Sequence, residues 1–170
     1  MKNKQLIRDT VIFAMLGAIM FCSKLVMELL PNIHLIGTLT MIYTLVYRKK
    51  ALYPIYIFVI LTGLYGGFGL WWAPYLYIWT ILWGITMLLP KNLDHKLGAF
   101  IYPLVCSLHG LLYGILYAPA QALMFGLDFD GMIAWIIAGF PFDLLHAGGN
   151  LVAGLLIIPL SKLLKKLERI

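Results

Sequence analysis

The chain has 170 residues, of which 62% are hydrophobic and only 12% are charged, and its formal net charge is +6. Average soluble domains are about 45–50% apolar and about 25% charged, so this composition excludes an ordinary soluble domain and predicts a protein whose solvent is the lipid bilayer. The excess of basic residues fits the cytoplasmic loops of a membrane protein, and we expect no nucleic acid as a partner.

Six apolar segments follow one another along the chain. Each is a candidate transmembrane helix, because about 20 apolar residues span a bilayer as a helix. The expected helices cover residues 9–30, 33–47, 52–68, 74–89, 98–125 and 132–160. Prolines inside the last two, Pro119 and Pro141, predict kinks, and residues 161–170 form a basic amphipathic tail. The prediction is therefore an all-α, polytopic membrane protein: one domain, residues 1–170, that forms a bundle of six transmembrane helices.

The distribution of charge predicts the orientation of this bundle. If the N-terminus is cytoplasmic, all but one of the 13 basic residues lie in cytoplasmic segments, and the exception is Lys24, late in the first helix. The outer connections carry only Asp128 and Asp130. Because basic residues are enriched on the cytoplasmic side of membrane proteins, we expect a multi-pass protein with both termini in the cytoplasm.

Three polar side chains interrupt the sixth apolar segment. Asp143, His146 and Asn150 are spaced i, i+3 and i+7, which places them on one face of a helix. A lipid-facing aspartate would cost about 2.5–3.5 kcal/mol, so this face is expected to point into the bundle. It could be a ligand or ion site, or a hydrogen-bond network that only locks the helices together. A pair between Asp143 and His146 would serve either role.

The fifth segment offers a second polar face, with His109, Tyr113, Tyr117 and Gln121 at steps of four residues. Aromatic residues at helical spacing are more often core than site, but a deep histidine such as His109 needs a hydrogen-bond acceptor. An intramembrane enzyme or an ion or proton carrier could use His109 together with Asp143 and His146. The spacing matches no metalloenzyme motif, however, so we predict no metal and no catalytic residue.

The first helix carries two further features. Lys24 and Glu28 form an i, i+4 pair near its outer end, which either neutralises itself or lines the mouth of an outward-facing cavity, together with Asn32 and His34 of the first loop. The Gly-rich loop that contains Trp72 could close over such a cavity, or could form an interfacial aromatic belt.

The inner half of the first helix contains Ala14, Gly17 and Ala18, a strip of small residues that lets another helix approach closely. The sequence contains no Gly-x-x-x-x-Gly-Lys-Ser/Thr motif, so any ATP-driven work belongs to a partner.

Together these features resemble the substrate-binding S component of an energy-coupling factor (ECF) transporter. The resemblance covers the whole chain in size and topology. It also includes AMLGA at residues 14–18, LTMIYTLVYRKK at 39–50 and LTGLYGG at 61–67. Many members carry a Pro-Phe-Asn-x-x-Lys element in helix 6, where this chain reads PFDLLH at residues 141–146.

The resemblance implies a vitamin importer in a bacterial plasma membrane. Such a subunit is not an enzyme and holds no cofactor. It captures a vitamin outside, and its Ala14–Ala18 strip docks on a transmembrane T subunit that is driven by two ATPases, which bind ATP and Mg. The implied pocket is aromatic and suits a heterocyclic vitamin such as hydroxymethylpyrimidine or, as the lead, cobalamin. Its expected residues are Asn32, His34, Trp72, Tyr75, Trp79, Tyr113, Gln121, Asp143, His146 and Asn150.

Overall fold

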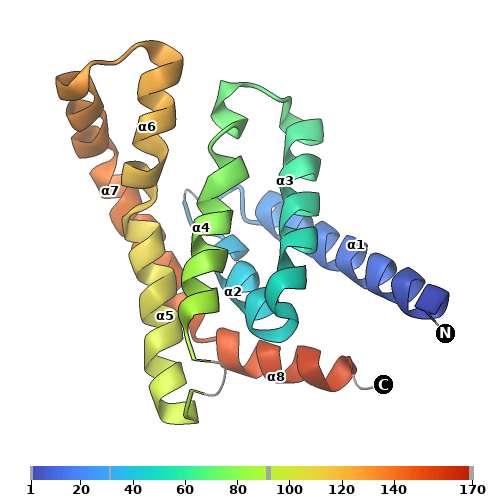
Figure 1. The fold of residues 1–170 in the computed structure, drawn as a ribbon. Coiled ribbons are helices and arrows are strands. Elements are labelled where there is room, and N and C mark those ends of the chain that lie inside the picture. Colours follow the sequence, from blue (N-terminus) through green and yellow to red (C-terminus); the bar gives the residue numbers. More distant parts are fainter. Residues whose placement is uncertain (1, 31, 91–92, 169–170) are drawn as a thin grey trace.

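The structure is a computed structural model that describes residues 2–30, 32–90 and 93–168. This part of the chain forms α-helices and two short 3₁₀ helices and contains no strand, which confirms the predicted all-α fold (Figure 1). The α-helices are α1 (Lys2–Val26), α2 (Ile36–Tyr47), α3 (Leu52–Gly66), α4 (Tyr75–Leu88), α5 (His95–Leu111), α6 (Tyr113–Phe125), α7 (Phe129–Gly154) and α8 (Ile157–Leu167). The 3₁₀ helices are η1 (Arg48–Ala51) and η2 (Leu70–Trp72).

Helices α2, α3 and α4 lie close to the predicted segments, whereas the first, fifth and sixth segments differ from their predicted bounds. The first helix begins at Lys2 and already ends at Val26, because the next residues form turns. The fifth segment is interrupted at Leu112, between α5 and α6, and α6 continues through Pro119, where a kink was predicted. The sixth ends at Gly154, and its continuation α8 runs in a different direction beneath the bundle (Figure 1).

Within residues 2–30, 32–90 and 93–168, three stretches are long and apolar enough to cross a membrane: Asn3–Val26, His95–Phe125 and Phe129–Gly154. The outer surface is rich in exposed apolar side chains, such as Phe100, 68% exposed, and Ile137, also 68% exposed. Exposed apolar surface of this extent marks a membrane-facing protein. Helices α2, α3 and α4 have only 12, 15 and 14 residues, fewer than the roughly 20 that a complete span requires.

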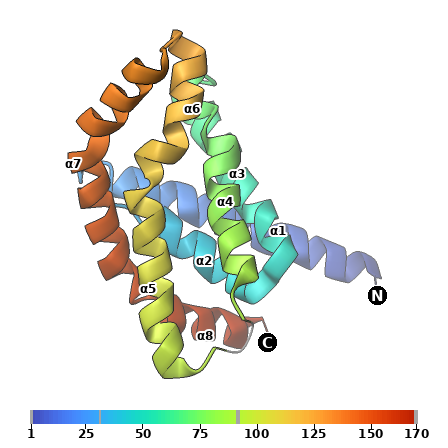
Figure 2. The same ribbon diagram turned by 60° about the vertical axis from the view of Figure 1, so that its left-hand side comes forward.

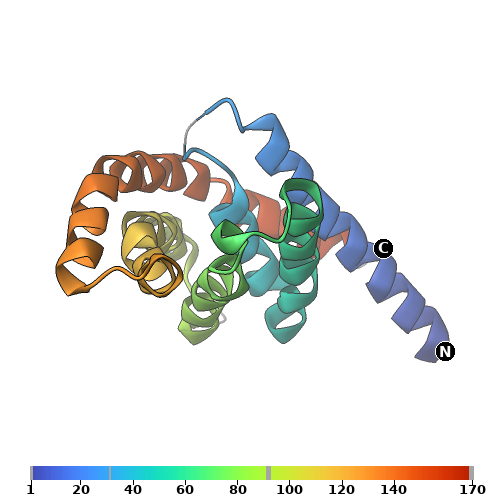
Figure 3. The ribbon, with the colours of Figure 1, turned by 90° about the horizontal axis from the view of Figure 1, so that it is seen from above.

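Helix α2 is the centre of the molecule, and the other helices surround it (Figure 3). Every residue from Ile36 to Thr44 is buried, which is expected of a helix that is hydrophobic all round. The Thr44 hydroxyl bonds within its own helix, donating to the Thr40 carbonyl oxygen at 2.6 Å, whereas Thr40 Oγ1 has no partner among the described residues.

Helix α1 packs on α3, and its N-terminal end extends beyond the other helices (Figures 1 and 3). Gly17 makes the contact possible, since a Cβ atom there would lie 2.5 Å from the side chain of Ile57. Two ion pairs tie this helix to the rest of the chain: Arg8 to Glu168 of α8 at 2.9 Å, and Asp9 to Lys50 at 2.7 Å.

The second close packing joins α5 and α6 to α7, which bends along its length beside them (Figure 2). Glycines line the contact. A Cβ atom on Gly110 would lie 2.8 Å from Asn150 Nδ2, and one on Gly154 would lie 2.6 Å from the Cα atom of Pro103. Gly110 and Gly114 form a Gly-x-x-x-Gly pair, which is typical of close helix packing in membranes. We call this contact the α5–α7 seam.

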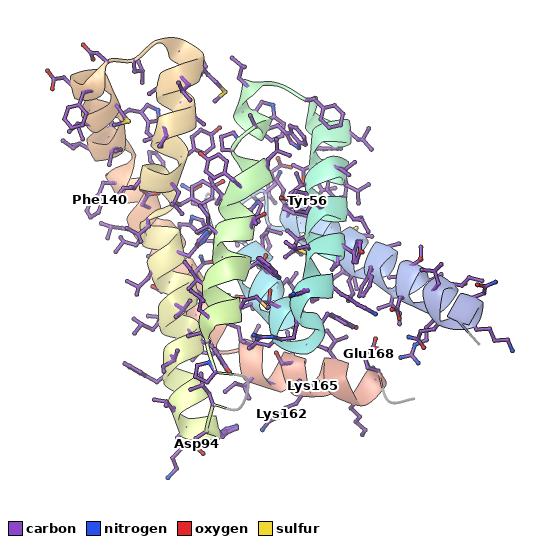
Figure 4. All side chains as sticks on the ribbon, in the orientation of Figure 1. Tyr56, Asp94, Phe140, Lys162, Lys165 and Glu168 are labelled. Atoms are coloured by element: carbon purple, nitrogen blue, oxygen red, sulfur yellow. The ribbon has the colours of Figure 1, made fainter. Side chains whose placement is uncertain are left out.

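Charged residues gather at one end of the molecule. The basic residues of η1, Lys96 of α5 and the three lysines of α8 lie there, and Figure 4 labels Asp94, Lys162, Lys165 and Glu168 at this end. The connections from α3 to α4 and from α6 to α7 lie at the opposite end (Figure 1). We call the two ends the basic end and the loop end.

Candidate functional site

A cavity of about 340 Å³ opens between the C-terminal end of α1, the α1–α2 connection, the start of α4, and helices α6 and α7. Five of the predicted site residues lie on its wall: Asn32, His34, Tyr75, Tyr113 and His146. Because these residues come from four separate parts of the chain, the fold brings them together. Their binding role stays a prediction.

Two histidines face each other on the wall, which also carries Lys24, Glu28 and Asn32. The rings of His34 and His146 are 4.7 Å apart between centroids, and His146 is only 3% exposed. Neither His34 Nδ1 nor His146 Nε2 has a hydrogen-bond partner in the part of the chain that the structure describes. A buried polar atom without a partner costs about 1–3 kcal/mol. Both nitrogens are themselves buried, so a ligand in the cavity would reach them only if the rings turned.

The histidine of the α1–α2 connection is uncharged. Burial lowers the pKa of His34 to about 4, so the ring is neutral at pH 7. A neutral imidazole has one nitrogen that donates and one that accepts. This part of the wall therefore matches a neutral polar group better than it matches a strong acid or base.

Aromatic rings form most of the remaining wall. Tyr113 lies 5.0 Å from His146 and 6.1 Å from Tyr117 between ring centroids. Trp79 stands behind this wall, 5.9 Å from Tyr75 and 6.0 Å from Tyr113, and is only 1% exposed. Trp79 therefore supports the cavity from the core and does not line it.

Lys24 and Glu28 lie at the cavity, 3.8 Å apart, and so form the ion pair expected from their spacing. Their side chains are 22% and 58% exposed, which places Glu28 at the open side. The pair neutralises itself and lines the cavity, so the two alternatives drawn from the sequence coexist. Both charges are available to a ligand at the mouth.

The loop between α3 and α4 contributes Trp71 to the wall, whereas the sequence singled out Trp72. The Trp72 indole N–H donates to the carbonyl oxygen of Val59 at 2.7 Å, which turns the ring into the protein. The loop is fixed across the cavity, because the Tyr117 hydroxyl donates to the Trp71 carbonyl oxygen at 2.9 Å. Tyr117 and Trp71 are thus the aromatic residues that the predicted site lacked.

Asp143 is buried in the α5–α7 seam and is not on the cavity wall. Its two carboxylate oxygens accept hydrogen bonds from the backbone N–H of Gly114, at 3.1 and 3.2 Å, and not from His146 as the spacing suggested. The amide of Gly114 is free because α6 begins at Tyr113 and its first N–H groups have no partner within the helix. Asp143 therefore caps α6 from the neighbouring helix, where the helix dipole also favours a negative charge.

Asn150 also belongs to the seam. It is 1% exposed, and its Nδ2 atom donates to the carbonyl oxygen of Cys106 at 3.1 Å. Gln121 is half-buried on α6 but away from the cavity wall. These two predicted site residues therefore lie outside the cavity.

The three residues that could have formed a catalytic or ion-carrying set do not converge. His109 Nε2 lies 3.2 Å from the carbonyl oxygen of Ile78 on α4, and Asp143 is engaged by Gly114. Among the described residues there is no group of three His, Cys, Asp or Glu side chains that could hold a metal ion. His146 alone of the three faces the cavity.

Comparison of the chain with models of protein families, with curated proteins and with solved structures gave no match.

Proposed function

We propose that this chain is the substrate-binding S component of an ECF-type importer, which captures a small heterocyclic vitamin or related micronutrient. The observation that carries the proposal is the cavity beside a wall of tyrosines, with two imidazole nitrogens, His34 Nδ1 and His146 Nε2, that have no partner in the described part of the chain. Ligand sites are mostly apolar and aromatic, with a few polar groups that fix orientation.

The volume of the cavity narrows the choice of ligand. Sites for small molecules enclose about 300–1,000 Å³, and the 340 Å³ found here is at the low end of that range. A ligand of one or two rings, such as a pyrimidine, fits better than the large corrin ring of cobalamin. The tyrosine rings offer faces for stacking, and the two histidines offer partners for ring nitrogens or hydroxyls.

The proposed orientation places the basic end in the cytoplasm of a bacterial cell, with both termini on that side. Its support is the gathering of lysines and arginines at one end, since basic residues mark cytoplasmic loops. In this orientation the mouth at Glu28 faces outward. The six predicted spans then include the short helices α2, α3 and α4.

The proposed docking strip for a T subunit is narrower than the sequence suggested. Gly17 already contacts Ile57 of α3, whereas Ala14 is exposed and Ala18 is half-buried on α1. A partner helix could therefore approach Ala14 and Ala18 closely. In this proposal the chain supplies binding and docking, and two partner ATPases supply ATP hydrolysis with Mg.

The alternative, an intramembrane enzyme or an ion carrier built on Asp143, His146 and His109, has less support. Asp143 is engaged by a backbone N–H group and His109 lies against a backbone carbonyl oxygen. A proton path would need these groups to reach one another or the cavity.

Mass spectrometry of small molecules released from gently purified protein tests the proposal. We expect an aromatic heterocycle to be released from the wild type and to be lost from His146→Ala. Gln121→Ala is the matched control, because it also shortens a polar side chain but lies off the cavity wall. Equal amounts of ligand from wild type and His146→Ala would refute this site.

Copurification separates the importer from its alternatives. An S component should copurify with a T subunit and two ATPases from its native membrane. Ala14→Trp should abolish that assembly and leave ligand release unchanged, because Ala14 is far from the cavity wall. A chain that binds its ligand but never copurifies with ATPases would be a carrier of another kind.

A further inference from the structure

A second cavity, of about 200 Å³, lies at the basic end between the end of α2, the start of α5 and helix α8. Its wall includes His95 at the first turn of α5 and Lys162 and Lys165, which are one turn apart on α8. Figure 4 shows both lysines at this end of the molecule, on the same side as Asp94. Two ammonium groups on the wall of one cavity attract an anion.

A buried hydroxyl in the same wall independently indicates a missing partner. Ser161 lines the cavity and is 6% exposed, and its Oγ atom has no hydrogen-bond partner among the described residues. An oxygen atom of a bound anion could accept a hydrogen bond from this hydroxyl. Charged acceptors make the stronger hydrogen bonds of this kind.

The positive charge at this cavity is not neutralised by the described part of the chain. Neither Lys162 nor Lys165 takes part in an ion pair there. The nearby carboxylates have other partners: Asp94 accepts a hydrogen bond from the Lys96 backbone N–H, and Glu168 is bound by Arg8.

The position of α8 indicates which anion reaches the cavity. The helix lies across the end of the bundle, where the apolar helices end (Figures 1 and 2). Its flank away from the cavity exposes Leu163 and Leu167, which are 52% and 56% exposed. A helix with one apolar flank and one lysine-rich flank lies at the depth of lipid headgroups. Apolar side chains such as Leu45 and Ile158 complete the cavity wall and could contact the glycerol and upper acyl chain.

We propose that this cavity binds the phosphate group of an anionic phospholipid in the leaflet at the basic end. Lys162 and Lys165 hold the phosphate, and the Ser161 hydroxyl donates to one of its oxygens. The lipid would thereby fasten α8 to the start of α5. This site is independent of the ligand cavity between α1, α6 and α7.

The test uses the full chain in a neutral detergent and counts bound lipids by native mass spectrometry during titration. The probes are dioleoylphosphatidylglycerol, dioleoylphosphatidylcholine and inorganic phosphate. We expect one phosphatidylglycerol to bind, at least about tenfold tighter than phosphatidylcholine, whose choline group is repelled by the lysines. The double variant Lys162→Gln/Lys165→Gln should weaken phosphatidylglycerol binding about tenfold.

Lys166→Gln is the control, because Lys166 is exposed on the same helix but does not line the cavity. We expect it to change lipid affinity less than about twofold at moderate ionic strength. Ser161→Ala should weaken binding about threefold, and its Tm without lipid shows whether it still folds.

Three results would overturn the proposal. Equal losses in Lys166→Gln and in the double variant would indicate general attraction to a basic surface. Full displacement of phosphatidylglycerol by millimolar inorganic phosphate would indicate a site for free phosphate. Equal affinity for the two lipids would show that charge does not select the ligand.

Discussion

The ligand cavity and the α5–α7 seam lie next to each other and draw on the same stretch of α7, but backbone groups engage the polar side chains of the seam and not the two histidines of the cavity. In the seam, Asp143 accepts from Gly114 N–H, and Asn150 Nδ2 donates to the Cys106 carbonyl oxygen, while Asn150 Oδ1 has no partner among the described residues. At the cavity, His34 and His146 each keep a buried ring nitrogen without a partner.

The difference between the two regions indicates whether a polar residue inside a membrane protein serves packing or ligand binding. A buried polar group costs free energy unless it is hydrogen-bonded. A side chain that is hydrogen-bonded to a backbone group therefore serves the packing of the helices. A group left incomplete beside a cavity can be completed by a ligand. We therefore expect seam residues to govern stability and cavity residues to govern binding.

The largest effect should come from filling the seam. Gly114→Val would place side-chain atoms where the Asp143 carboxylate lies, and would separate α6 from α7. Overpacking together with a broken buried hydrogen bond should cost about 3 kcal/mol or more. Fluorescence-detected size-exclusion chromatography should show little folded protein. Gly148→Val is the control on α7, since nothing lies within 4 Å of a Cβ atom there; an equal loss in both would contradict the role of the seam.

Removing the amide of Asn150 should have the next largest effect. Asn150→Ala removes the donor to the Cys106 carbonyl oxygen and leaves a void at the glycine contact of the seam. We expect about 1–3 kcal/mol of destabilisation, measured as a lower Tm in detergent, with ligand affinity unchanged. Loss of ligand binding at unchanged Tm would show that Asn150 acts in ligand binding and not in the packing of the seam.

His146→Ala should weaken ligand binding, which Asn150→Ala should leave unchanged. The substitution removes one of the two unpartnered nitrogens at the cavity and should weaken ligand binding at least tenfold, which is about 1.4 kcal/mol. The Tm without ligand should fall as well, because the buried ring packs on His34 and Tyr113 and its removal leaves a void. The loss of affinity, which Asn150→Ala should not show, separates the two variants. Isothermal titration with the ligand identified by mass spectrometry measures the first effect, and a melting curve the second.

Asp143→Asn should have the smallest effect. The amide oxygen of asparagine can still accept the hydrogen bond from Gly114 N–H, so only the interaction of the charge with the end of α6 is lost, about 0.5–1 kcal/mol. The Tm should fall slightly and ligand affinity should stay the same. A tenfold loss of affinity here would show that the cavity and the seam are one site.

The sequence was sufficient to predict most of the helices and five of the residues that line the cavity. Long apolar runs predict helices from composition alone, which is why α2, α3 and α4 lie where expected. It was insufficient to predict hydrogen bonds in which a polar side chain binds a backbone group. No side-chain pattern reveals that Asp143 binds an amide at the break after Leu112, and the break itself follows no proline. The spacing of Asp143 and His146 places both on one face of α7. That face contacts the seam at Asp143 and the cavity at His146, because α7 is bent.

Two features missed from the sequence had visible signals. The Gly-x-x-x-Gly pair of Gly110 and Gly114 is as clear a sign of close helix packing as the strip of small residues at Ala14 and Ala18 on the first helix. Trp71 and Trp72 are adjacent, and the sequence does not show which of them faces the cavity. In the fold, the indole N–H of Trp72 donates to the Val59 carbonyl oxygen, which leaves Trp71 at the cavity.

The shortness of α2, α3 and α4 has a consequence for the surrounding bilayer. With 12, 15 and 14 residues at about 1.5 Å per residue, they are roughly 18–23 Å long, whereas the hydrocarbon layer is about 30 Å thick. Helix α2 is buried among its neighbours, but α3 and α4 expose apolar side chains, so if they span the bilayer as proposed, the hydrophobic mismatch lies on their side of the bundle. The bilayer should thin there and keep its thickness along α5, α6 and α7. Since α4 carries Tyr75 of the cavity wall, acyl-chain length becomes a variable that acts on the ligand site.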